Sequence, residues 1–230
     1  MKRMVCQGIV LVASLSILIS ANAQGLRDSP RSIPTAADTP SQGTQTINDP
    51  IAFGHPLTFW IQVLRERNFE TFDLAIDAIV MLGPGAKAAI PELTQVLNEP
   101  FNPITFGTDT REEIRSKLLS IHFKAGAVDG LGAMGEEAAG TADAVIRWGL
   151  TRRVIASDAR PRSTDGILIG LIGVDVLERM RAAGAVARFG ANAAGPVQSL
   201  IQSDDNEKRK FAAAIMNDET VDRFGRVQDL

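Results

Sequence analysis

The sequence has few of the residues that cross-link chains, bind metals or act as nucleophiles. Its 230 residues include one cysteine, Cys6, two histidines and no tyrosine. A single cysteine excludes an intramolecular disulfide and a cysteine-based zinc site. Neither His55 nor His122 is followed by a glutamate or a second histidine at a ligand spacing, and the sequence contains no G-x-S-x-G nucleophile motif. We therefore expect no metal, no cofactor, no catalytic residue and no enzymatic activity.

An excess of positive charge is lacking as well. Lysine and arginine total 24 against 27 acidic residues, which gives a formal net charge of −3. Proteins that bind nucleic acids normally carry a basic excess that neutralises phosphates, so we expect no nucleic acid as a partner. A chain that is 45% hydrophobic and 22% charged has the composition of one large folded domain or a short repeat array.

The N-terminal apolar run is too short to span a membrane. Residues Ile9–Ile19 fall below the ~20 apolar residues that a spanning helix needs. Lys2 and Arg3 precede the run, and Ala21–Ala23 follow it with the small-x-small spacing of a secretory cleavage site. We predict a signal peptide over residues 1–23, cleaved near Ala23, and an extracytoplasmic location, periplasmic or secreted. No stable membrane insertion is then expected; a retained anchor is the alternative.

Residues 24–54 are rich in Ser, Thr, Pro, Gly and Asp, with only isolated apolar residues. Such a segment buries too little apolar surface to offset the entropy of ordering the chain. We predict a disordered linker over 24–54 and a helical domain over 55–230.

Three glycines, Gly83, Gly135 and Gly190, mark a repeat within that domain. Apolar or small residues recur at six fixed distances from each glycine, and the spacings of four and three before it place them on one face of a helix. Each glycine would end that helix in a left-handed conformation, and a second helix would follow. A single hairpin of this kind cannot cover its apolar face, so the hairpins must stack. The recurring positions are Ala75, Ala127 and Ala182; Ile79, Leu131 and Val186; Leu82, Met134 and Phe189; Ala86, Ala138 and Ala193; Ile90, Ala142 and Val197; and Leu93, Val145 and Leu200.

The segment AIDAIVMLGPGAKAAIPELTQVL, Ala75–Leu97, resembles a bacterial HEAT repeat of the phycobilisome lyase-type group. The resemblance covers about Pro56 to Leu230 and implies an all-α fold, a right-handed α-solenoid of stacked helical hairpins. It implies a binding surface rather than a catalyst: a protein–protein interaction scaffold with an unknown protein partner. An accessory or maturation factor, lyase-like, is the alternative.

The flanking sequences predict where further helices begin. Thr110 and Glu113 form a capping-box pattern, so a long helix should start at Arg111 and run to Gly135. A second long helix is expected over 166–189, and Asp205 should cap a last one. Two insertions, EPFNPITFGTDT and TRRVIASDARPRSTDGILIG, lie between the marked units and should emerge from one end of the stack.

The string GLGAMG, Gly130–Gly135, matches the G-x-G-x-x-G of dinucleotide-binding folds, and Asp158 follows at a distance suited to a ribose contact. That motif requires a buried strand before it, but KAGAVD is not a Val/Ile-rich run. A nucleotide-binding enzyme is therefore carried only as a lesser alternative.

The surface offers two candidate binding regions. If the second helix of each unit lines a concave face, Gln95, Arg147 and Gln202 fall in register there, with Glu92 and Asp143 nearby. These polar side chains are our candidate protein-binding residues, because hydrogen-bonding groups of this kind suit protein contacts; a solvated face without a partner is the alternative.

The second candidate is an arginine-rich insertion. Arg152, Arg153, Arg160 and Arg162 could bind an anion through their guanidinium groups, or could simply form a soluble loop. The two tryptophans, Trp60 and Trp148, are expected to pack in the interior.

Overall fold

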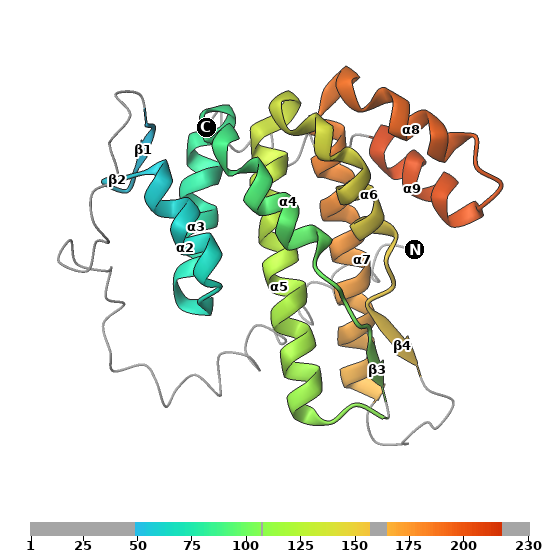
Figure 1. The fold of residues 1–230 in the computed structure, drawn as a ribbon. Helices are drawn as coiled ribbons and strands as arrows, with labels where there is room; N and C mark the ends of the chain where they lie inside the picture. Colours follow the sequence, from blue (N-terminus) through green and yellow to red (C-terminus); the bar gives the residue numbers. More distant parts are fainter. Residues whose placement is uncertain (1–48, 107, 157–164, 218–230) are drawn as a thin grey trace, which may run out of the picture.

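The computed structural model describes residues 49–106, 108–156 and 165–217, and these are mostly helical, with two short strand pairs (Figure 1). The all-α class predicted from the sequence is confirmed at this level. The predicted signal peptide, residues 1–23, lies outside the described residues, and so do residues 24–48 of the predicted linker.

The structure describes residues 49–54, which the sequence analysis assigned to the linker. Strand β1 (Ile51–Ala52) pairs antiparallel with β2 (His55–Pro56), and Ala52 is buried. Just before them, Asp49 accepts hydrogen bonds from the backbone N–H and the hydroxyl of Thr58, at the start of helix α2 (Leu57–Glu66). Residues 49–54 therefore belong to the domain, because their backbone and side chains fix its first helix.

Three successive units follow the pattern helix, 3₁₀ turn, helix. Each unit begins at a long first helix and turns at its marker glycine, and the 3₁₀ turn after each glycine is a feature that the sequence reading did not include. The units are α3 (Phe69–Leu82), η3 (Gly83–Ala89) and α4 (Ile90–Asn98); α5 (Arg111–Met134), η4 (Gly135–Thr141) and α6 (Ala142–Leu150); and α7 (Asp165–Arg188), η5 (Gly190–Ala193) and α8 (Ala194–Ile201).

The three marker glycines all have positive φ, as predicted. The values are 52° at Gly83, 59° at Gly135 and 61° at Gly190. The ψ angles of the first two, −127° and −129°, differ from the left-handed helical conformation that we expected. They place both residues in the mirror image of the extended region, which glycine reaches readily because it lacks a Cβ atom. The chain thereby turns sharply from the first helix into the 3₁₀ segment.

The units stack through the recurring apolar positions. Ala75, Ala127 and Ala182 are fully buried, and the other recurring positions are buried or packed against the core. Helices α3, α5 and α7 lie side by side, with α4 and α6 on one side of that row (Figure 1). The repeat columns thus supply the contacts between neighbouring units.

Glycines inside α5 allow these helices to approach closely. A Cβ atom on Gly130 would lie 3.0 Å from Leu93 of α4, and one on Gly132 would lie 3.1 Å from the Cβ atom of Ala185 in α7. Both glycines belong to GLGAMG. This string forms the last turn of α5 and its C-cap, so the segment directly before it is a helix and not a strand. This geometry does not support a dinucleotide site.

The two insertions meet at one end of the stack, as predicted, and there they pair. Strand β3 (Ile104–Phe106) and strand β4 (Val154–Ala156) form a short parallel sheet at the lower end of the view, next to the beginning of α5 (Figure 1). The backbone N–H of Ile104 donates to the carbonyl of Arg153 at 2.7 Å. The sheet is a tertiary contact between segments about fifty residues apart, and the local sequence gave no sign of it.

The predicted helix starts are confirmed. Thr110 and Glu113 form both hydrogen bonds of a capping box at the start of α5. Asp205 caps helix α9 (Asn206–Met216), which packs against α7, α8 and α6. The α9 contact with α6 is close because Gly149 faces the ring of Phe211.

One stretch of the described chain, Phe69–Asn98, is long and apolar enough by composition to cross a membrane. It is interrupted at Gly83, and its two α-helices have 14 and 9 residues. Neither reaches the ~20 residues that a spanning helix needs, and the stretch supplies much of the core of the first unit.

Candidate protein-interaction face

The candidate site is the exposed surface that carries Gln95 of α4 and Asp143 and Arg147 of α6, and we call it the α4–α6 face. Gln95 of α4 and Arg147 of α6 occupy the same repeat position, and both are exposed. Arg147 donates a hydrogen bond to the side-chain oxygen of Asn98 at 3.4 Å, across the α4–α6 contact. Asp143 is exposed in the first turn of α6. The structure therefore brings three of the predicted residues together on two adjacent helices.

Gln202 does not continue this row. It is exposed at the C-terminal end of α8, but α8 packs mainly against α9, which itself contacts α6. The alignment of Gln95, Arg147 and Gln202 in the sequence assumed that the second helix of each unit contacts the second helix of the next unit. The insertion of α9 next to α6 interrupts that regular arrangement, so Gln202 is separated from Gln95 and Arg147.

Glu92 is not available as a surface contact. Glu92 is 8% exposed, and its carboxylate lies 2.9 Å from Nε of Arg65 in α2. The expectation for Glu92 as a protein-binding residue is wrong, because the side chain joins α2 to α4. A second ion pair, between Arg67 and Glu99 at 2.8 Å, ties the end of α2 to the end of α4.

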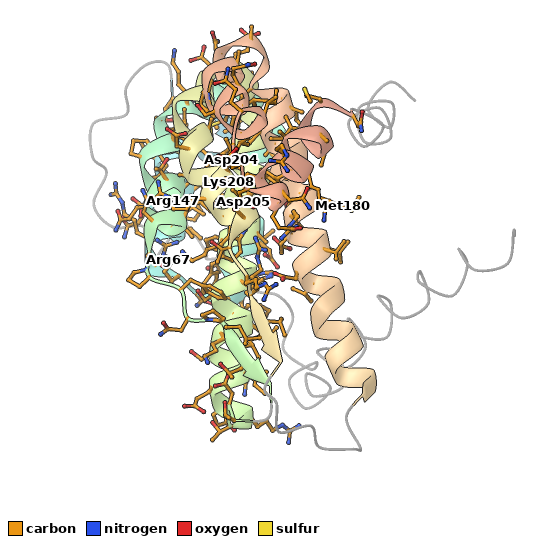
Figure 2. All side chains as sticks on the ribbon, turned by 90° about the vertical axis from the view of Figure 1, so that its right-hand side faces the viewer. Arg67, Arg147, Met180, Asp204, Asp205 and Lys208 are labelled. Carbon is orange, nitrogen blue, oxygen red and sulfur yellow. The ribbon has the colours of Figure 1, made fainter. Side chains whose placement is uncertain are left out.

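Figure 2 shows that Arg67 and Arg147 lie on one side of the molecule and Met180 of α7 on the other. Arg67, next to the end of α2, therefore lies on the same side of the molecule as the α4–α6 face. Met180, at 47% exposure, marks the opposite side and offers a position for control substitutions.

A buried lysine, which the sequence reading missed, supports this face from below. Lys124 of α5 is 1% exposed, and its ammonium donates to the carbonyls of Val96, Leu97 and Glu99 at 2.7, 3.0 and 2.7 Å. These carbonyls lie at the C-terminal end of α4, where the last groups of a helix lack partners within the helix. Burial lowers the pKa of Lys124 to about 8. The sequence did contain a signal: Lys124 is spaced three and four residues from the apolar positions Ile121 and Val128.

A buried arginine does the same for α6. Arg153 is fully buried and donates to the carbonyls of Trp148 and Thr151, and its Nη1 lies 3.1 Å from Asp175. Its guanidinium stacks 4.0 Å from the centre of the Trp148 ring. The expectation for Arg153 as an anion-binding residue is wrong, because its guanidinium is fully buried and both Nη atoms donate to internal acceptors. Arg152, the neighbouring residue, is exposed.

The predicted anion-binding loop also includes two arginines further along the chain. Arg160 and Arg162 lie outside the described residues, and so does Asp158. Trp60 and Trp148, at 4% and 3% exposure, are packed in the interior as predicted.

Acidic groups at the α5–α7 contact are paired with Arg181. Asp129 bonds Arg181, and Glu178 lies 3.4 Å from Nε of Arg181. Burial raises the pKa of both carboxyl groups. The pair between Asp129 and Arg181 joins α5 to α7, and Glu178 contacts Arg181 within α7. These residues therefore contribute to the packing of the two helices. Within the part of the chain that the structure describes, no three His, Cys, Asp or Glu side chains are grouped so that they could hold a metal ion.

The chain was compared with models of protein families, with curated proteins and with solved structures, and none of the three comparisons finds a match. Its fold and its function therefore have to be argued from its own residues.

Proposed function

We propose that the chain is an exported, HEAT-like stack of helical hairpins that acts as a protein–protein interaction scaffold, with the α4–α6 face as its binding surface. The stacked order of three helix–turn–helix units supports the HEAT-like architecture. The N-terminal pattern of Lys2, Arg3 and Ala21–Ala23 supports export.

The observation that carries the proposal is which positions of the second helices are buried and which are exposed. In α4 and α6 the recurring apolar positions enter the core, whereas Gln95 and Arg147, at an equivalent position of two units, remain exposed on two helices that contact each other. Arginine is enriched at the centres of protein interfaces, because its guanidinium donates several hydrogen bonds and its stem adds apolar area. A repeated polar position on a wall held rigid from below by Lys124 and Arg153 is suited to contacts with a protein.

A charge reversal tests the proposal. The tagged chain and two variants, Arg147→Glu and Met180→Glu, are used to capture proteins from the extracytoplasmic fraction of the source cells. Each variant places one new carboxylate at an exposed position, on opposite sides of the molecule.

We expect a protein captured by the wild type and by Met180→Glu to be reduced at least about tenfold with Arg147→Glu, since losing a central arginine costs about 1–2 kcal/mol or more of binding free energy. Equal capture by all three chains would contradict the α4–α6 face. If capture were lost only with Met180→Glu, the binding surface would lie on α7 and not on the α4–α6 face.

A further inference from the structure

A cavity of about 120 Å³ lies at the N-terminal end of the stack, between the β1–β2 hairpin, α2 and α3. It is separate from the α4–α6 face. Phe53, His55, Phe59 and Trp60 contribute aromatic rings to its wall, and Thr71 and Leu74 of α3 complete it. The cavity is lined mainly by apolar groups and opens to the surface at its rim, where Phe53 is exposed.

The rings are arranged around one another in the geometries that aromatic groups favour. Phe59 and Trp60 meet edge to face at 4.9 Å, and His55 stacks on Phe59 at 4.3 Å between ring centres. Phe53 meets Trp60 edge to face at 6.1 Å. A further ring inside the cavity would find both edges and faces as partners, which is how aromatic side chains attract each other beyond the area that they bury.

The wall is held in place before any ligand arrives. The indole Nε1–H of Trp60 donates to the carbonyl of Ala52 at 3.0 Å, which fixes the ring against the hairpin. Phe53 has φ of 50° and Gly54 has φ of 78°, so the two-residue turn holds a bulky residue in a left-handed conformation. Strain of this kind is concentrated at ligand sites and persists only where the surrounding structure maintains it. Phe53 is nevertheless 52% exposed, so its ring stands at the surface beside the cavity.

One polar group among the lining residues lacks a partner. The hydroxyl of Thr71 is buried and has no hydrogen-bond partner among the described residues. A buried hydroxyl without a partner costs free energy, and a ligand that supplies the missing hydrogen bond recovers it.

We propose that this cavity binds a single uncharged aromatic ring that carries one hydrogen-bonding group, a phenol or the side chain of a tyrosine. The volume limits the ligand to one ring, because an apolar cavity of about 150 Å³ in another protein holds benzene, whereas larger ligands and cofactors need roughly 300 Å³ or more. Among the described residues, the wall presents no Lys, Arg, Asp or Glu side chain, so a charged ligand would lose its hydration without compensation. The ring fills the void between Phe53, Trp60 and Leu74. The hydroxyl of Thr71 is covered in the structure, so it bonds the polar group of the ligand by turning towards the cavity.

Titration of the purified chain with phenol, and with toluene as the ring that lacks the hydroxyl, tests the proposal by NMR. The two tryptophans give two indole N–H signals, of which Trp60 lines the cavity while Trp148 lies between Lys124 and Arg153. We expect the Trp60 signal to shift in a saturable way while the Trp148 signal does not move.

Two variants sharpen the test. Leu74→Phe fills the cavity and should weaken phenol binding at least about tenfold while both indole signals remain dispersed, which reports a retained fold. Thr71→Val keeps the shape of the side chain and removes the hydroxyl. It should weaken phenol several-fold and leave toluene unchanged.

The source of the ring is decided by competition with a short tyrosine peptide. Displacement of phenol by the peptide assigns the cavity to a partner's side chain, and phenol binding without displacement assigns it to a free small molecule. A Trp60 signal that does not shift, or phenol affinity that is equal in the wild type and Leu74→Phe, would overturn the proposal. Toluene binding as tightly as phenol would overturn the role of Thr71.

Discussion

Lys124 and Arg153 play equivalent roles in two neighbouring units. Each places a buried cation at the C-terminal carbonyls of a second helix, and each lies against the ring of Trp148. A cation there also interacts favourably with the negative end of the helix dipole. The ends of α4 and α6 are thus fixed by side chains from outside those helices, which keeps the α4–α6 face rigid.

The lowered pKa of Lys124 predicts a pH-dependent stability. Its folded value of about 8 lies below the ordinary value of 10.5, so the unfolded chain binds this proton more tightly. The free energy of unfolding should therefore rise as pH increases from about 8 to 10.5, by up to about 3 kcal/mol for this group. Urea unfolding of the wild type and of Lys124→Met across this range measures the effect. The variant should lose the rise and the exposed control Lys87→Met should keep it; equal slopes in all three would contradict the role of Lys124.

The burial of Arg153 predicts a large difference between adjacent arginines. Arg153→Ala removes the partner of Asp175 and of two carbonyls, and should lower the free energy of unfolding by about 3 kcal/mol. Arg152→Ala changes an exposed side chain and should stay within about 0.5 kcal/mol of the wild type. Denaturant unfolding compares the two. Similar losses in both would show that the stacking on Trp148 and the internal hydrogen bonds contribute little.

At the scale of elements, glycines decide how closely the helices pack. Gly130 and Gly132 were noticed in the sequence because they match a nucleotide-binding string, yet in the structure they let α5 approach α4 on one side and α7 on the other. A residue pattern alone does not distinguish the two roles, because both require a close approach to the backbone. What decides is the preceding segment, which is helical here.

The contact between α6 and α9 gives the clearest test of this packing. A Cβ atom on Gly149 would lie 2.8 Å from Cε2 of Phe211 and 3.0 Å from the Cβ atom of Ala182. Gly149→Ala should therefore push α9 outward and lower the free energy of unfolding by about 1–3 kcal/mol. Gly184→Ala is the matched control, because a Cβ atom there meets nothing within 4 Å in helix α7. It should stabilise the chain by about 0.5–1 kcal/mol through the higher helix propensity of alanine. A destabilised Gly184→Ala or an unaffected Gly149→Ala in thermal unfolding would contradict this packing.

Over the whole molecule, local and long-range features differed in how well the sequence predicted them. The marker glycines, the capping box at Thr110 and the cap at Asp205 act within a few residues, and all were found from the sequence. The β3–β4 pair joins two insertions, and the position of α9 depends on which neighbours remain uncovered, so neither has a local signal.

The candidate site shows the same limit. Gln95 and Arg147, which follow the repeat register, are exposed as expected, and so is Asp143. Glu92 and Arg153 were expected on the surface although tertiary partners bury them. The aromatic cavity was not predicted either. It forms only when the β1–β2 hairpin folds onto α2 and α3.

Site-specific photo-crosslinking in the source cells tests the scaffold function most directly. A photoreactive residue is placed at Gln95, at Arg147 or, as a control, at Met180 on the opposite side of the molecule. We predict one shared crosslinked protein from positions 95 and 147 and its absence from position 180. Crosslinks from position 180 alone, or none from any of the three positions, would contradict a protein-binding role for the α4–α6 face.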